Sequence, residues 1–404
     1  MLKQVSDSRH QSYVVYGNHV LLMTRILSSI FYISSMRKTS EEFNSETAIK
    51  NIGILCGEEL SELPYWETIN DYLKRFSDNE LQKVICELVR HLLRSRAFED
   101  ARIRGKYWQI ILDGTQLQRS RKELDKRSLY SVHKKGTEEE YREYYYYVLE
   151  AKLVLHEKIQ VSIMTEFVEN EGREAEKQDC ERNAAKRLME KLKKEYPMLL
   201  VCICGDSLYA CESFFEDCEK KRWKYILRYK QGSIPSIYEE YREVKGMEKN
   251  GINTENGRYD YVTDIEYRKE KVNVAEYVEY EEKEKKTEYL FLTNLALSRQ
   301  NIKNVIERGR WRWKIENEGF NIQKNHGYYL EHMYSRDYQG IKNHYYLIQI
   351  GHMIAQIMEA IEKLWKKVKQ SKEQKHQRIL ESWKTELLSE YMEEMEKPYQ
   401  IRFI

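Results

Sequence analysis

The sequence has few of the residues that interrupt or cross-link a chain. It contains only 4 Pro and 17 Gly in 404 residues, which excludes collagen-like repeats and long proline-rich linkers. Its 7 Cys are an odd number spread over a long chain, so they do not form the disulfide framework of a small secreted domain. Cys202 and Cys204 share an apolar run without further ligands at a zinc-site spacing, and we expect them in the core.

Signals for export or membrane insertion are also missing. The first residues lack the apolar core of a secretory signal. The most apolar early stretch, residues 20–33, contains Arg25 and is too short to span a bilayer. We therefore expect a soluble intracellular protein.

The chain has no excess of charge of one sign. The 68 Lys+Arg and 66 Asp+Glu residues give a formal net charge of +2, so any nucleic-acid surface has to come from local segregation of charge. A glycine-rich phosphate loop and a Gly-x-Ser-x-Gly motif are absent, which disfavours nucleotide-driven motors and serine hydrolases. What the chain has in abundance is tyrosine, with 32 residues, which suits half-buried strands and wet interfaces.

Residues 1–104 are predicted to form an all-helical N-terminal domain. Apolar residues recur there at three- and four-residue spacing, as on one face of a helix. The predicted helices cover residues 20–37, 40–55, 68–75 and 79–96.

Residues 105–229 change to short apolar runs. These predict strands at YWQIILDGT, LLVCICGD and WKYILRY, a hairpin at YYYYVLEAKLVL and IQVSIMTEFV, and helices over residues 175–196 and 209–221. The first strand is expected to stop at an Asp-Gly turn, and the basic segment 119–135 after it is predicted to be an exposed charged loop that could also track phosphates. The order of elements indicates an α/β unit with a mixed sheet.

The remainder divides into three parts. Residues 230–297 alternate polar and aromatic residues, which predicts a β-rich insertion. Residues 298–368 return to a helical pattern, with a long helix over residues 341–368. The charged residues 369–404 are predicted to be a solvated helical tail.

Three acidic residues have contexts that suggest chemistry. Asp113 and Asp206 each follow a predicted buried strand, where ligands of α/β sheets usually bind, and Glu316 lies inside a predicted helix. Carboxylates from two strand ends and one helix can converge on a pair of Mg²⁺ ions, which prefer oxygen ligands and promote in-line phosphoryl displacement. Taken singly, each is an ordinary turn or cap residue, so the hypothesis rests on the three together.

The helix around Glu316 is basic and aromatic. Arg312 is four residues before Glu316, Trp311 and Trp313 flank the arginine, and Lys324 lies two turns further on. Such a helix beside a metal site suits gripping a phosphate backbone and stacking on an unpaired base. The plainer alternative is an Arg312–Glu316 ion pair on a solvated helix with the tryptophans partly in the core.

These residues resemble a known family. The run GRWRWKIENEGFNIQKN is similar to the third signature of the DDE transposases of bacterial insertion sequences, which in many members is Tyr-x2-Arg-x3-Glu-x6-Lys with a Trp after the Arg and an Ile before the Glu. Arg312, Trp313, Ile315 and Glu316 fit this pattern in register. IILDGTQL and CICGDSLYA resemble the two Asp motifs, and LPYWETINDYL and EFVENEGREAEKQDCERNAAKRL are also similar to the same group, so the resemblance runs from about residue 60 to 360.

The chain departs from the signature at two positions. Gly309 stands where the Tyr would be, and Gln323 occupies the Lys position, with Lys324 one residue later. These departures concern the Tyr and Lys contributions to DNA binding, for which Lys324 could substitute from an adjacent angle.

The resemblance implies an RNase H-like catalytic core in which Asp113, Asp206 and Glu316 bind two Mg²⁺ ions, with Mn²⁺ able to substitute. It implies water-driven cleavage of DNA at the terminal inverted repeats of an insertion sequence, followed by attack of the freed 3′-OH on target DNA, without a protein nucleophile. Arg312, Lys324, Trp311 and Trp313 would then contact DNA. The active complex would be at least a homodimer, in the cytoplasm of a bacterium.

The domain organisation implied in this way has five parts. These are residues 1–104 for DNA-end binding, 105–229 as the first part of the core, 230–297 as the insertion, 298–368 as the C-terminal core helices and 369–404 as the tail. Two rival functions stay open, namely an RNase H-like nuclease that does not join strands and a catalytically silent DNA-binding protein.

Overall fold

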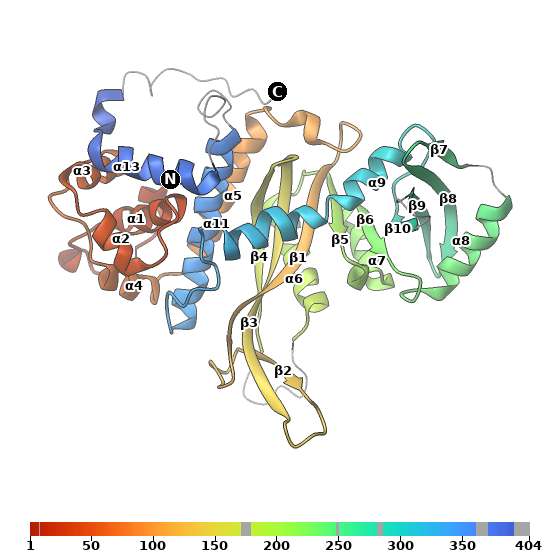
Figure 1. Ribbon diagram of the computed structural model, residues 1–404, viewed down its shortest axis with the longest axis horizontal. Coiled ribbons are helices and arrows are strands. Elements are labelled where there is room, and N and C mark those ends of the chain that lie inside the picture. The colour runs from red at the N-terminus through yellow and green to blue at the C-terminus, as the bar shows by residue number, and fades with distance from the viewer. Residues whose placement is uncertain (8, 171–178, 248–249, 281–285, 361–370, 392–404) are drawn as a thin grey trace.

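The computed structural model describes residues 1–7, 9–170, 179–247, 250–280, 286–360 and 371–391 (Figure 1). One mixed sheet runs through the middle of the molecule, with the N-terminal helices at one end and the strands of the 230–297 region at the other. The strands are β1 (Trp108–Ser120), β2 (Leu129–His133), β3 (Tyr141–His156), β4 (Ile159–Val168), β5 (Val201–Gly205), β6 (Lys224–Tyr229), β7 (Ile252–Thr254), β8 (Gly257–Tyr267), β9 (Glu270–Tyr280) and β10 (Lys286–Thr293).

Helices cover both faces of this sheet. The α-helices are α1 (Asn18–Ile30), α2 (Met36–Glu42), α3 (Glu46–Cys56), α4 (Trp66–Leu73), α5 (Asp78–Arg94), α6 (Glu181–Glu195), α7 (Glu212–Lys221), α8 (Pro235–Met247), α9 (Ile302–Arg310), α10 (Asn321–Asn325), α11 (Tyr338–Ala360) and α13 (Lys372–Thr385). The short turns are the 3₁₀ helices η1 (Leu2–Gln4), η2 (Gln11–Tyr13), η3 (Glu99–Ala101), η4 (Ser207–Tyr209) and η7 (Leu388–Tyr391), and the π-helical turn η6 (Ile315–Phe320).

Five strands of the sheet have the RNase H-like arrangement. Their order is β4-β3-β1-β5-β6; β3 runs antiparallel to β4 and β1, whereas β5 is parallel to both β1 and β6. This confirms the predicted α/β fold class with its mixed-sheet core. Because β1 and β5 are parallel neighbours, the residues that follow their paired segments, on the carboxyl side of each, lie side by side.

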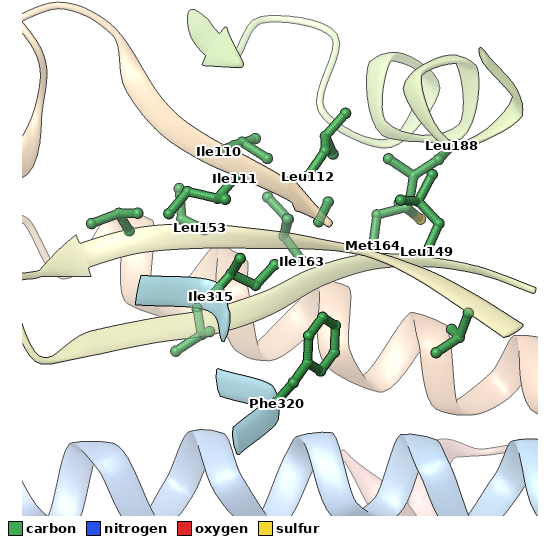
Figure 2. Close-up of a cluster of buried hydrophobic side chains, with 14 of the residues drawn as sticks. Ile110, Ile111, Leu112, Leu149, Leu153, Ile163, Met164, Leu188, Ile315 and Phe320 are labelled. Carbon is green, nitrogen blue, oxygen red and sulfur yellow. The ribbon is translucent and has the colours of Figure 1, made fainter. Parts of the chain in front are cut away.

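The core forms where apolar strands are covered on two sides. Figure 2 shows Leu188 of α6 on one face of β1, β3 and β4, and Ile315 and Phe320 of η6 on the other. All three side chains are 5% exposed or less, and burying such a side chain contributes on the order of 1.5–3 kcal/mol. Cys202 and Cys204 in β5 are completely buried, as expected from their apolar run.

Two local predictions in the sheet region were wrong. The first strand does not stop at Asp113, because β1 continues to Ser120 through an antiparallel ladder with β3. Within the segment 119–135, predicted to be a charged loop, residues 129–133 form β2, which pairs with the far end of β3. In both cases a partner strand distant in the sequence provides backbone hydrogen bonds that local composition does not reveal.

The 230–297 region contains β7 to β10, as expected, and also the helix α8, which was not predicted. Its strands do not form a separate sheet. β10 pairs antiparallel with β6, and β9, β8 and β7 follow outward, so the sheet of the core continues into this region.

Some of the predicted helices are shorter in the structure or are divided into two. The helix expected over residues 20–37 ends near Ile30, and a second begins after Ser35, whose hydroxyl accepts a hydrogen bond from the backbone of Lys38. The helix expected over residues 209–221 begins only at Glu212. Such caps and short turns divide long apolar patterns into separate helices.

The C-terminal part is not simply solvated. In α13, Leu380 and Trp383 are buried, and Asn51 of α3 donates hydrogen bonds to the carbonyls of Trp383 at 3.0 Å and Glu386 at 2.8 Å. The prediction of a solvated tail was therefore wrong for residues 372–385, whose apolar stripe packs on the N-terminal helices. The positions 361–370 and 392–404 of the predicted helices lie outside the described residues.

No helix in the described part of the chain combines the length and apolar character needed to cross a bilayer.

Candidate active site

A pocket of about 430 Å³ lies where the pairing of β1 with β5 ends, next to the carboxyl end of β5. It brings together all three acidic residues and two of the four basic and aromatic residues predicted from the sequence. The residues that line it are Asp113, Gly114, Thr115, Asp206, Arg312, Glu316, Phe320, Asn321 and Lys324.

Asp113 extends from β1 just beyond the last residue paired with β5, Ile111. One of its oxygens accepts a hydrogen bond from the backbone of Gly114 at 3.0 Å. Burial raises the pKa of Asp113 to about 6; the Arg312 charge opposes this rise, and the charges of Glu181 and Glu316 add to it. The positive charge of Arg312 therefore offsets only part of the effect that burial has on the pKa of Asp113.

Asp206 is the residue at which β5 ends and the short helix η4 begins. Its Oδ1 accepts a hydrogen bond from the backbone of Ser207 at 2.5 Å, which caps η4. The strand-to-helix transition thus points this carboxylate out of the carboxyl end of the sheet, next to the strand that carries Asp113.

Glu316 is an exposed residue of the π-helical turn η6. The buried side chains of Ile315 and Phe320 anchor this turn on the sheet (Figure 2). The helical pattern predicted from residue 298 is therefore divided, since α9 ends at Arg310 and the π turn precedes α10. A π turn inserts an extra residue in the helical repeat, and such turns are frequent at functional sites.

Arg312 lies beside Asp113 rather than Glu316. Its Nη1 is 4.0 Å from Asp113 Oδ2, and its guanidinium lies 5.1 Å from the ring centre of Trp313. Among the described ion pairs, none joins Arg312 to Glu316, so the plainer alternative of such a pair on a solvated helix was wrong.

The two tryptophans are not among the residues that line the described pocket. Trp313 is 50% exposed, whereas Trp311 is partly buried with the Arg308 guanidinium 4.1 Å from its ring. Trp313 is therefore exposed with Arg312 over its ring, whereas Trp311 packs against the core.

The structure gives a physical reason for each departure from the signature. At Gly309, a Cβ atom would lie 2.6 Å from the ring of Phe291, so α9 approaches the sheet too closely for a tyrosine. Gln323 is completely buried, donates a hydrogen bond to Gln349 of α11 and accepts one from it. Lys324 lines the pocket instead, with its ammonium 2.9 Å from Glu331.

Sequence reasoning missed several residues near the three carboxylates. Thr115 and Asn321 line the pocket, and Glu181 acts electrostatically on Asp113. Thr115 was detectable, because residues two apart in a strand share a face. Glu181 belongs to the family-like run of residues 166–188, but that resemblance did not indicate that it lies near Asp113.

The donor set suits a hard divalent cation. Three carboxylates from three elements line the pocket, and oxygen ligands are what Mg²⁺ and Mn²⁺ prefer. As the side chains stand, no group of three or more His, Cys, Asp or Glu in the described residues is close enough together to hold a metal ion. The fit therefore rests on the type of ligand that lines the pocket, three carboxylate side chains.

Comparison with known proteins identifies a family. The family model described as "Transposase DDE domain" matches residues 104–354, which is more than half of the chain. No protein among the curated sequences matches. A similar solved structure is the piggyBac transposase in a synaptic complex with hairpin DNA, with a TM-score of 0.40 and 10% identity, covering 97% of this chain and 76% of that chain.

Proposed function

Because the chain belongs to the transposase DDE domain family, we propose that it cleaves DNA at the ends of a bacterial insertion sequence and joins the freed 3′-OH ends to target DNA. The observation that carries the proposal is that Asp113, Asp206 and Glu316 line one pocket, although more than 200 positions separate the first from the last. Like charges that share a pocket disfavour each other, and a bound cation would offset that repulsion.

In this proposal Asp113, Asp206 and Glu316 hold two divalent ions, Mg²⁺ or Mn²⁺. When bound, such ions polarise the phosphate and lower the pKa of water, which is the chemistry that phosphodiester cleavage requires. The chain then has to orient the DNA strand and exclude bulk water, and no side chain needs to act as a nucleophile.

Arg312 and Lys324 are the residues proposed to orient the phosphate backbone. The guanidinium offers a planar fork of donors that matches phosphate oxygens, whereas the ammonium acts as a point charge. Both line the pocket beside the carboxylates. Trp313 is exposed next to Arg312 and offers a stacking surface for an unpaired base.

The roles of the remaining segments and the assembly of the chain belong to the same proposal. Residues 1–104 would bind the terminal inverted repeats, and two copies of the chain would assemble on paired ends. The remaining boundaries at residues 229, 297 and 368 would separate the core segments from the insertion and the tail.

The test uses the full chain with Mg²⁺ or Mn²⁺ and duplex DNA that carries the element's ends. We expect cleavage that Asp113→Asn abolishes and that Asp100→Asn, a neutralised exposed aspartate ahead of β1, leaves unchanged. Cleavage that survives Asp113→Asn would end the assignment of this residue.

Joining is measured separately, by transfer of labelled 3′-OH ends into a second duplex. Cleavage without transfer would indicate a nuclease, and salt-sensitive DNA binding without turnover or metal dependence would indicate a silent DNA-binding protein.

A further inference from the structure

Glu181, the first residue of α6, accepts a hydrogen bond on each carboxylate oxygen. Tyr147 Oη is 2.5 Å from its Oε2, and Tyr209 Oη is 2.5 Å from its Oε1. We call these three residues the Glu181 cluster. Burial, together with the charge of Glu181, raises the pKa of both tyrosines well above the usual range, so both hydroxyls remain donors.

Tyr147 connects the Glu181 cluster to the segment that carries Asp113. It extends from β3 across Gly114, the residue after Asp113, and a Cβ atom on Gly114 would lie 2.0 Å from its hydroxyl oxygen. Only a glycine next to Asp113 therefore leaves room for the tyrosine that binds Glu181.

Tyr209 connects the Glu181 cluster to the segment that carries Asp206. It is the last residue of η4, three positions after Asp206, and is 1% exposed. A Cβ atom on Gly205, the residue before Asp206, would lie 2.6 Å from its ring. The two aspartate segments thus share one arrangement. In each, a glycine next to the aspartate leaves room for a tyrosine, and the hydroxyl of that tyrosine donates a hydrogen bond to one oxygen of Glu181.

The charge of Glu181 also reaches the pocket. Tyr147, whose hydroxyl binds Glu181, lies against Gly114, the residue after Asp113, and in the described part of the chain no Lys, Arg or His forms an ion pair with Glu181. The negative charge of Glu181 would attract a cation bound by Asp113. Groups behind the metal ligands strengthen metal binding in other sites in a similar way.

We propose that Glu181 is a positioning residue of the acidic pocket, which holds the Asp113 and Asp206 segments at a fixed spacing and adds negative charge that strengthens the binding of divalent cations. This inference rests on the proposed function, because it assumes that the pocket binds such cations. Glu181 itself need not touch the metal or the DNA.

The experiment measures Mn²⁺ affinity of the full chain without DNA, from the electron paramagnetic resonance signal of free Mn²⁺. We expect Glu181→Gln to weaken Mn²⁺ binding by roughly 10- to 100-fold, the usual effect of removing a partner of the metal ligands. Tyr147→Phe combined with Tyr209→Phe keeps the charge but removes both hydroxyls, and should weaken binding less. The control is Glu190→Gln, which neutralises an exposed glutamate further along α6 and should bind Mn²⁺ as the unchanged chain does.

The outcomes separate this inference from the proposed function. Absence of Mn²⁺ binding in the unchanged chain would refute both. Tight binding that Asp113→Asn removes but Glu181→Gln does not change would overturn the role of Glu181 alone. If Glu181→Gln fails to fold, the double tyrosine variant decides: unchanged affinity overturns the inference, and weaker affinity with an unchanged melting temperature supports it.

Discussion

The three carboxylates of the pocket are held by two very different parts of the molecule. Asp113 and Asp206 extend from neighbouring parallel strands whose backbones are bonded on both sides. Glu316 lies on the segment from α9 to α10, where a π turn interrupts the helix and only a few buried side chains hold it on the sheet. The sheet therefore sets the spacing of two carboxylates rigidly, whereas side-chain packing alone sets the position of the third.

The largest expected effect tests whether both parts serve one reaction. Asp206→Asn and Glu316→Gln should each lower DNA cleavage at least about a thousandfold, roughly 4 kcal/mol of activation free energy. The measurement is the single-turnover cleavage rate at saturating Mn²⁺, with the melting temperature as a check on folding. Loss of cleavage in only one variant would mean that the strand end and the π turn do not form a common site.

The next prediction concerns how the helical segment is held. Gln323→Lys, which restores the signature residue, should destabilise the protein by about 3 kcal/mol or more, because a second ammonium would be buried without a partner. Lys152, itself completely buried, already donates a hydrogen bond to Gln349, the residue that Gln323 contacts. The measurement is the free energy of unfolding in urea.

The matched control for this prediction is one residue away. Lys324→Gln removes an ammonium from the pocket wall and should change stability little, while lowering DNA affinity and its dependence on salt. Equal stability of Gln323→Lys and the unchanged chain would contradict the buried position of residue 323.

A smaller effect is expected where α9 contacts the sheet. Gly309→Ala should cost about 1–3 kcal/mol, since its methyl group would lie 2.6 Å from Phe291 and 3.0 Å from Ile226, both buried. Gly319→Ala, in the π turn, places its methyl group 3.7 Å from Ile315 and should be neutral or stabilising. Urea unfolding measures the difference in free energy of unfolding between the two variants. Equal values would contradict the close contact of α9 with the sheet.

The smallest effect is a dependence of stability on pH. Burial lowers the pKa of His352 and of His344 well below the usual value, and the charge of Lys152 also acts on His352. These histidines stay neutral in the folded protein. Their contribution to the free energy of unfolding is therefore complete above pH ~6.5, and below that pH the free energy of unfolding falls by about 1.4 kcal/mol per pH unit for each histidine.

His352 is within 2.8 Å of Gln323, so acid should loosen the helical segment rather than the strand ends. When thermal unfolding is measured between pH 7.5 and 5.5, the melting temperature of His352→Gln should fall less with decreasing pH than that of the unchanged chain. His91→Gln, at an exposed histidine of α5, is the control and should keep the full loss.

Sequence reasoning succeeded where local pattern and buried strands coincide. The runs around Asp113 and Asp206 are apolar enough to predict buried strands, and the order of elements between them predicts the mixed sheet. It failed where a distant partner decides the local structure. β2 exists because the far end of β3 offers a free edge, and α13 packs because α3 presents Asn51 and an apolar face.

The candidate site divides in the same way. The identities of the three carboxylates and of Arg312 followed from the residues and from a family resemblance. Lys324 was expected to replace the signature lysine because of its charge, whereas the π turn between Arg312 and Lys324, which changes the helical phase, was not predicted. Glu181 could not be predicted as a neighbour of Asp113, since Tyr147 and Tyr209 bring it there from separate elements.

The amino-acid sequence by itself determined the kind of fold and the chemical character of the site, because apolar periodicity and carboxylate-bearing motifs are local properties. Only the tertiary structure decided that Lys324 rather than residue 323 reaches the pocket, that α9 requires a glycine, and that Glu181 lies behind the aspartates. These features depend on which surfaces meet after folding, and burial and charge act across space between residues that are far apart along the chain.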